Sequence, residues 1–255
     1  MEMGLGGLKV LVTAGAGGIG LEVARAFVEE GARVHVCDVD REALAALPPD
    51  IGATHADVAS REDVARLFAE ATATLGGLDC LVNNAGTAGP TGRVEEIDPE
   101  DWDRTLDICL TGQFNCVRLA VPLLRASANP SIVNLSSAAG RFGFPLRTPY
   151  AAAKWAVVGF TKSLSRELGG DGIRVNAVLP GIVAGDRQRR VLEAKAQQRG
   201  IGFSEMEGAA FAAASIKDYV TARQLADQIL FLASARGKTI SGQALAVDGD
   251  LQMLT

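Results

Sequence analysis

The sequence has 255 residues, of which 48% are hydrophobic and 22% are charged, and its formal net charge at pH 7 is −5. Burial of this much apolar surface can offset the entropy of ordering the chain, as in a globular protein. The basic residues form no dominant run, and no apolar stretch approaches the roughly 20 residues that span a bilayer, so we expect no nucleic-acid or membrane partner.

Short β-rich segments alternate with segments of helical periodicity along the whole chain. Strands are expected at residues 9–14, 32–38, 52–56, 78–83, 131–136, 173–180 and 243–249. Helices are expected at residues 21–30, 41–47, 61–75, 99–125, 149–168, 186–215 and 221–233, the sixth interrupted near residues 200–202. This alternation predicts one Rossmann-type α/β domain over residues 1–255, a doubly wound parallel sheet of about seven strands with helices on both faces.

A glycine-rich segment, TAGAGGIG at residues 13–20, lies between the first expected strand and the first expected helix. Glycines let the backbone approach a pyrophosphate, and the helix dipole attracts its negative charge. Asp38 ends the second expected strand about 18 residues after the last glycine, where an acid that binds the ribose belongs. We therefore predict a site for NAD(H), with an acid that disfavours NADP(H). The cofactor contacts predicted in the loop are Thr13, Gly15, Gly17, Gly18, Ile19 and Gly20.

Tyr150 and Lys154 lie one helical turn apart in the helix that Pro149 begins. The pKa of a free tyrosine is about 10, and a nearby ammonium lowers it toward the range that acid–base chemistry needs. Ser137, at the end of the fifth expected strand, could hydrogen-bond the same reacting oxygen. We therefore predict Ser137, Tyr150 and Lys154 as the catalytic residues.

Several motifs in this order resemble those of the short-chain dehydrogenase/reductase family. They are TAGAGGIG, Asp38, ADV at 56–58, NNAG at 83–86, NLSS at 134–137, YAAAK at 150–154 and LPGIV at 179–183. The resemblance covers almost the whole chain. It implies an NAD(H)-dependent alcohol dehydrogenase or carbonyl reductase that acts on CH–OH donors and, by analogy with the family, forms a homotetramer.

The resemblance also implies a role for each site residue. Tyr150 would be the general acid in reduction and the general base in oxidation, Lys154 would hold the nicotinamide ribose and lower the pKa of Tyr150, and Ser137 would position the substrate oxygen. Asp57 and Val58 would frame the adenine. The other implied cofactor contacts are Asn84, Ala85, Gly86, Pro180, Gly181 and the backbone of Val183.

Three positions depart from the family pattern. Ala14 replaces the first glycine of the loop, and Gly185 stands where many relatives have a threonine that touches the cofactor. Cys109 stands where the family has the asparagine of its catalytic tetrad, which is thought to hold a water partly through its backbone carbonyl. Cysteine keeps that carbonyl but lacks the amide's donors and acceptor. This puts the proton relay, but not the fold, in question.

The substrate would bind beyond the carboxyl ends of the strands, next to residues 87–93, 138–148 and the stretch after Gly185. Residues 185–200 are basic and occupy the family's lid position, so we expect a substrate lid around residues 185–220. A basic lid could select an anionic substrate such as a carboxylate or sugar acid. A charge run is more often a solvated helix face, and this interpretation is favoured here.

The preferred function is hydride transfer between NAD(H) and a small alcohol or ketone. One alternative is an enzyme like 3-oxoacyl-carrier-protein reductase, which usually prefers NADPH and which Asp38 disfavours. The other is a catalytically quiet NAD-binding regulatory protein. Ser137, Tyr150 and Lys154 argue against the quiet protein, whereas Cys109 leaves it open.

The cysteines and histidines predict no disulfide and no metal site. His35 and His55 have no ligand partners at useful spacing. The cysteines show neither CxxC spacing nor the spacing of paired disulfides, and the N-terminal segment lacks signal-peptide features. Together these observations predict a reduced, cytoplasmic protein. The cysteines are Cys37, Cys80, Cys109 and Cys116.

Overall fold

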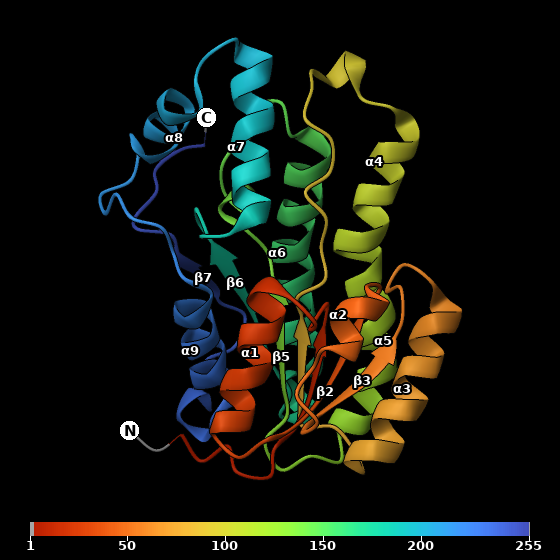
Figure 1. The fold of residues 1–255 in the computed structure, drawn as a ribbon. Coiled ribbons are helices and arrows are strands. Elements are labelled where there is room, and N and C mark those ends of the chain that lie inside the picture. Colours follow the sequence, from red (N-terminus) through yellow and green to blue (C-terminus); the bar gives the residue numbers. More distant parts are fainter. Residues whose placement is uncertain (1–2, 255) are drawn as a thin grey trace.

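The computed structural model describes residues 3–254, and in this part of the chain seven parallel strands form one sheet in the order β3-β2-β1-β4-β5-β6-β7 (Figure 1). The chain reverses its direction across the sheet between β1 and β4, which creates a crevice at the carboxyl ends of these strands. The doubly wound parallel sheet predicted from the sequence is therefore confirmed. The strands are β1 (Lys9–Thr13), β2 (Arg33–Asp38), β3 (Ile51–His55), β4 (Cys80–Asn83), β5 (Ser131–Leu135), β6 (Arg174–Pro180) and β7 (Ala244–Val247).

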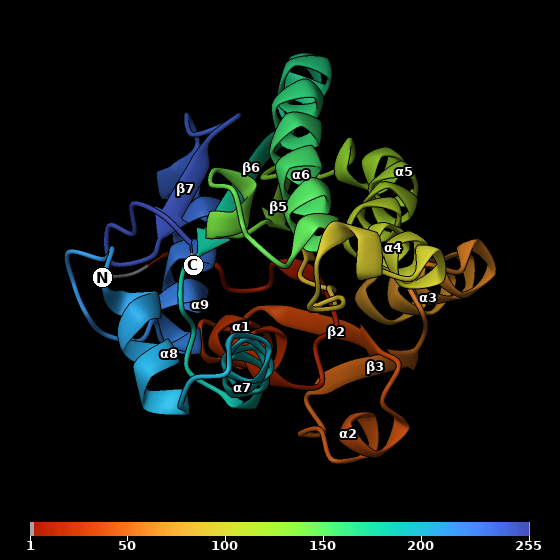
Figure 2. The same cartoon turned by 90° about the horizontal axis from the view of Figure 1, so that it is seen from above.

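Helices cover both faces of the sheet (Figure 2). On one face α1 packs against α9, and on the other lie α3, α5 and α6. Successive side chains of a strand point to opposite faces, so Val10 and Val12 join the core under α1 while Leu11 joins the core under α3. The helices are α1 (Gly18–Glu29), α2 (Arg41–Ala45), α3 (Arg61–Leu75), α4 (Pro99–Leu106), α5 (Gly112–Leu124), α6 (Thr148–Leu168), α7 (Asp186–Arg199), α8 (Phe203–Phe211) and α9 (Ala222–Ala233).

One expected helix differs from the structure near the site, and the interruption expected in another is present. The helix expected over residues 99–125 is divided into α4 and α5 by a π-helical turn at Asp107–Thr111. The helix expected over residues 186–215 stops at Gly200, whose φ of 65° caps α7, and α8 then begins at Phe203. Glycine adopts this left-handed conformation without the clash that a Cβ would cause.

The elements bring the predicted site residues to one edge of the sheet. Thr13, Asp38 and Pro180 each end a strand, and parallel strands end at the same edge. Figure 1 shows α7 and α8 beyond the carboxyl end of β6. Within residues 3–254, none of the helices combines the length and apolar character needed to cross a membrane.

Candidate active site

The glycine loop between β1 and α1 is held in place by hydrogen bonds with the turn that follows β4. The hydroxyl of Thr13 accepts hydrogen bonds from the backbone N–H groups of Asn84 and Ala85, at 3.0 and 2.9 Å. The Asn84 side chain donates to the carbonyls of Thr13 and Ala14, each at 3.0 Å. A Cβ on Gly20 would lie 2.1 Å from the carbonyl oxygen of Ala14, so only glycine lets α1 start this close to the loop.

Ala14 replaces a family glycine at a position with a left-handed backbone conformation. Ala14 has a φ of 50°, in the left-handed region that disfavours residues with a Cβ. The loop therefore carries local strain that glycine would relieve. This cost was not evident from the sequence, because the remaining glycines of the loop predict enough freedom.

Asp38 is held at the end of β2 beside the glycine loop. Its carboxylate accepts hydrogen bonds from the backbone N–H groups of Ala16, at 3.1 Å, and Asp40, at 3.2 Å. The residue after it, Val39, is exposed, and Gly17 faces open space. No cation is therefore placed at these two positions to neutralise Asp38 or a phosphate bound next to it.

A cleft of about 630 Å³ runs from Asp38 to the start of α6. Among the predicted site residues, those that line it are Gly17, Gly18, Ile19, Asp38, Asn84, Gly86, Ser137, Tyr150, Lys154, Pro180, Gly181 and Val183. The structure thus brings together the predicted catalytic residues and most of the predicted cofactor contacts.

Six predicted cofactor contacts lie outside the lining of this cleft: Thr13, Gly15, Gly20, Asp57, Val58 and Ala85. Thr13 and Gly20 shape the loop from behind, as described above. The carboxylate of Asp57 instead pairs with Arg104 at 3.0 Å, and Val58 is buried against Gly112. An adenine contact by Asp57 or Val58 stays a prediction.

The three predicted catalytic side chains meet where β5 ends and α6 begins. Ser137 caps a short turn, its hydroxyl oxygen accepting a hydrogen bond from the N–H of Ala139 at 3.1 Å. Lys154 is buried, and its Nζ donates to the carbonyl of Leu135 at 2.8 Å and lies 5.6 Å from the centre of the Tyr150 ring. The hydroxyl of Ser136 donates to the carbonyl of Lys154 at 2.7 Å, which holds α6 against the end of β5.

Cys109 lies in the π-helical turn next to Lys154. Its side chain is fully buried, with Sγ 3.6 Å from the carbonyl oxygen of Thr87. Gly86 separates it from the lysine, because a Cβ on Gly86 would lie 3.5 Å from Nζ of Lys154 and 3.6 Å from Sγ of Cys109. π-Helical turns are frequent at functional sites, where they re-aim backbone groups. The residue that departs from the family pattern therefore lies close to Lys154, with Gly86 between them.

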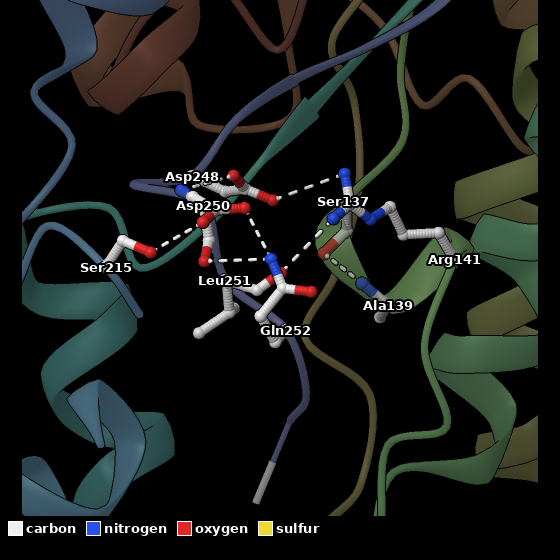
Figure 3. Close-up of polar contacts among 8 residues, drawn as sticks. All are labelled: Ser137, Ala139, Arg141, Ser215, Asp248, Asp250, Leu251 and Gln252. Carbon is white, nitrogen blue, oxygen red and sulfur yellow. Dashed lines mark hydrogen bonds and ion pairs between the residues drawn. The ribbon is translucent and has the colours of Figure 1, made fainter. Parts of the chain in front are cut away.

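A polar network ties the C-terminal segment to the loop that carries Ser137 (Figure 3). One guanidinium nitrogen of Arg141 donates to the carbonyl of Leu251 at 3.2 Å, and the other lies 3.8 Å from the carboxylate of Asp248. Ser215 donates to Asp250 at 2.5 Å from the other side. A Cβ on Gly181 would lie 2.6 Å from Cα of Asp248, so this segment also packs on the Pro180–Gly181 turn. The segment therefore links the residues after α8 to the serine loop.

Two buried cations at the substrate end were missed by the sequence analysis. Arg147 and Lys195 are each only 2% exposed, and both lie next to the Phe144 ring. Burial and the charge of Arg147 lower the pKa of Lys195 to about 7. The sequence around Arg147, FGFPLR, is apolar, which was the available signal that its arginine would be enclosed.

Known proteins with similar sequences and structures include several named as reductases or dehydrogenases. Residues 14–251 match the family model described as enoyl-(acyl carrier protein) reductase. The 3-oxoacyl-[acyl-carrier-protein] reductase FabG of Thermotoga maritima is 34% identical over 256 residues, which covers 98% of this chain and 99% of that protein.

Two solved structures are similar over nearly the whole chain. The crystal structure of NAD⁺-bound xylitol dehydrogenase has a TM-score of 0.91 and 26% identity, covering 96% of this chain and 99% of that one. The crystal structure of a point variant of actinorhodin polyketide ketoreductase with NADPH has a TM-score of 0.88 and 33% identity, covering 94% of this chain and 95% of that one. Both kinds of nicotinamide cofactor thus occur among similar structures.

Proposed function

Because the chain belongs to the short-chain dehydrogenase/reductase family of oxidoreductases, we propose that it transfers a hydride between NAD(H) and a small alcohol or ketone. The observation that carries the proposal is the shared cleft, in which Asp38 lies at one end and Ser137, Tyr150 and Lys154 lie at the other. A cofactor that binds along this cleft would reach the catalytic side chains.

The residues at the glycine loop fit a dinucleotide diphosphate. The N-cap of α1, Gly17, makes no side-chain cap hydrogen bond, and the first turn of α1 contains no acidic residue. The N–H groups at this helix end are thus available to an anion, which the helix dipole also favours. A Cβ on Gly17 or Gly18 would meet no atom of the described residues within 4 Å, so bare backbone faces the open cleft.

Asp38 supports NAD(H) as the cofactor rather than NADP(H). Its carboxylate would accept hydrogen bonds from the hydroxyls of the adenosine ribose, whereas a 2′-phosphate there would face a like charge. The neighbouring Gly17 and Val39 offer no positive charge to relieve that repulsion. The NADPH-bound ketoreductase shows that the family accommodates either cofactor, so Asp38 carries this part of the proposal.

The chain's own residues would move and hold the proton. When bound, the nicotinamide supplies or accepts the hydride. Tyr150 would donate its hydroxyl proton to the substrate oxygen in reduction and take it back in oxidation, and Lys154 would hold the nicotinamide ribose. The Ser137 oxygen already accepts a hydrogen bond from Ala139, so its hydroxyl proton is available to the substrate oxygen.

The helices after Gly185 would close the substrate end. Arg187, Arg190 and Val191 of α7 line the same cleft as Tyr150, which supports a substrate lid around residues 185–220. Backbone hydrogen exchange in α7 is expected to slow when NADH binds together with a substrate analogue. Unchanged exchange would mean that this segment is a fixed wall instead.

A homotetramer in the cytoplasm completes the proposal. Phe114 on α5 and Trp155 on α6 are 44% and 51% exposed, and large exposed apolar side chains of this kind suit an interface with further copies of the chain. Light scattering on the purified protein would measure the number of subunits. A monomer at micromolar concentration would contradict this part.

A cofactor-coupled screen tests the function itself. Oxo acids, hydroxy acids, polyols and cyclic alcohols would be followed by NADH absorbance, and we expect turnover of at least one class. A preference for 3-oxoacyl thioesters would favour the alternative that the similarity to FabG supports. NADH binding with no turnover of any class would favour the catalytically quiet NAD-binding protein.

A further inference from the structure

A second, smaller cavity opens beside the catalytic tyrosine and is positively charged. Its volume is about 360 Å³, and it lies between the turn after β4 and helix α7. Three of its lining residues, Arg147, Arg187 and Arg190, are arginines, and no aspartate or glutamate of the described chain lines it. All three arginines also line the cleft that holds Tyr150, so the cavity is continuous with the candidate active site.

Arg147 is the buried cation of this cavity, and most of its donors are unused. One Nη donates to the carbonyl of Ala88, whereas Nε and the other Nη have no hydrogen-bond partner among residues 3–254. No carboxylate of the same residues lies within 4.0 Å of its guanidinium. A buried guanidinium without a counterion is costly, so a protein that retains one has a use for its unsatisfied charge.

The Arg147 guanidinium lies close to Tyr150, the residue proposed to exchange a proton with the substrate. Its guanidinium carbon lies 5.5 Å from the centre of the Tyr150 ring and 5.5 Å from that of Phe144. Arg187 reaches the same place from α7, donating to the carbonyl of Gly86 at 3.2 Å. Lys195 also lies over Phe144, with Nζ 3.8 Å from the ring centre. Arg147 thus lies next to the Tyr150 ring, and Lys195 of α7 lies next to the neighbouring Phe144 ring.

We propose that the Arg147 guanidinium binds a carboxylate of the substrate, so that the enzyme acts on small oxo and hydroxy acids. The three N–H donors on its unpartnered Nε and Nη atoms match the acceptor oxygens of a carboxylate, and because these atoms are enclosed in this structure, the carboxylate would reach them when α7, the expected lid, opens. Arg187 and Arg190 add charge at the cavity rim. The short distance from Arg147 to Tyr150 places the carboxylate within a few bonds of the carbon that reacts. This inference rests on the proposed function and names its substrate class.

The test compares acids with their uncharged esters. A panel of 2-, 3- and 4-oxo acids and the methyl ester of each would be assayed with NADH for the wild-type protein and for Arg147→Met, Arg147→Lys and Arg166→Met. Arg166 is an exposed arginine of the same helix and serves as the matched control. We expect the wild type and Arg166→Met to prefer an acid over its ester by about tenfold or more in kcat/KM.

The variants of Arg147 distinguish a role of its positive charge in substrate preference from a role of its side chain in stability. Arg147→Met should lose the preference through a higher KM for the acid, with the KM for the ester unchanged, and Arg147→Lys should retain part of it. The melting temperature of Arg147→Met should not fall, because the wild-type charge has no carboxylate partner in the described chain. Equal kcat/KM for acid and ester in the wild type, or an unchanged preference in Arg147→Met, would overturn the proposal.

A binding measurement keeps this test independent of turnover. The NADH-loaded protein would be titrated in a calorimeter with the same acids carrying CH2 in place of the oxo group, which cannot be reduced. We expect the wild type to bind them and Arg147→Met to bind them about tenfold or more weakly. Binding that depends on Arg147, without turnover of any class in the cofactor-coupled screen, would support the carboxylate site and refute the proposed function. No binding of any analogue, with normal NADH binding, would overturn the carboxylate site.

Discussion

The cofactor half of the cleft and its substrate half are built from different materials. The cofactor half, formed by residues 13–20, Asp38 and residues 83–86, presents backbone groups and one acid, and hydrogen bonds between loops fix it. The substrate half, formed by residues 141–148 and α7, presents long cationic side chains that pack around Phe144. Backbone geometry can be encoded by a local motif, whereas a side-chain pocket depends on which distant segments cover it.

The largest expected effect on turnover is that of replacing Tyr150, which lies where the two halves of the cleft meet. Tyr150→Phe should lower turnover by roughly two to four orders of magnitude, the usual range for the loss of a general acid or base. NADH binding should persist, measured by energy transfer from protein to nicotinamide fluorescence, because the glycine loop is untouched. Tyr219→Phe, at the other tyrosine of the chain, is the matched control and should keep most of its turnover. Comparable turnover in both variants would remove Tyr150 from its assigned role.

The second prediction concerns the cofactor half alone. An Asp38 carboxylate about 4 Å from a 2′-phosphate would experience a repulsion of about 1–4 kcal/mol, depending on the effective dielectric. The wild type should therefore favour NADH over NADPH by about tenfold or more in kcat/KM, and Asp38→Ser should reduce that ratio sharply. The preference among substrates should stay the same in Asp38→Ser if the two halves act independently. Equal use of both cofactors by the wild type would contradict the assignment of Asp38.

The third prediction concerns the substrate half and pH. Burial and the positive charge of Arg147 lower the pKa of Lys195 to about 7, below the roughly 10.4 of an unfolded lysine. Between these pH values the unfolded chain binds a proton that the folded protein lacks, so this lysine makes stability rise with pH from about 7 to about 10. Below about pH 7 both states are protonated, and the full cost of the buried charge is present.

Lys195→Met should remove this dependence. The free energy of unfolding of the variant should exceed that of the wild type most at neutral pH and approach it as the pH rises. Chemical denaturation across that range would measure the difference, with the exposed Lys238→Met as the control. Parallel curves for wild type and Lys195→Met would contradict the lowered pKa.

The smallest effect is expected at Cys109. Cys109→Asn restores the residue type of the family, but the backbone carbonyl, which would hold the relay water, is present in both proteins. Turnover and its pH profile should therefore change little. The carbonyl of Thr87, 3.6 Å from Sγ, is in place to accept a hydrogen bond from the new amide, which limits the cost of burying it. A clear gain in turnover, with no loss of melting temperature, would instead mean that the wild-type relay is impaired.

The cofactor half was predictable from the sequence to a large extent. The alternating pattern predicted the sheet, and the spacing from the glycine loop to Asp38 predicted the acid at the end of β2, because both are local features of one strand–turn–helix unit. The hydrogen bonds from Asn84 to Thr13 and Ala14 join segments about 70 residues apart, which only the folded sheet brings together. The positive φ of Ala14 follows from that packing as well.

The substrate half was less predictable for a physical reason. In the sequence Arg147 is one charge beside the apolar residues 142–146, and its burial depends on α7 packing over Phe144. The basic residues of α7 were interpreted as a solvated face, and Arg187 and Arg190 are indeed exposed, but they also line the substrate cavity. Lys195 of the same helix is buried, so a charge run can serve a solvated face and a pocket at once.

Direct observation of the transferred hydrogen tests the central claim most sharply. The protein would be incubated with NADH that carries deuterium at the transferable position and with the oxo acid panel, and the products would be analysed by mass spectrometry. The account predicts deuterium on the former carbonyl carbon of at least one hydroxy acid in the wild type, formed far more slowly by Tyr150→Phe. Bound NADH with no deuterium in any product would contradict it.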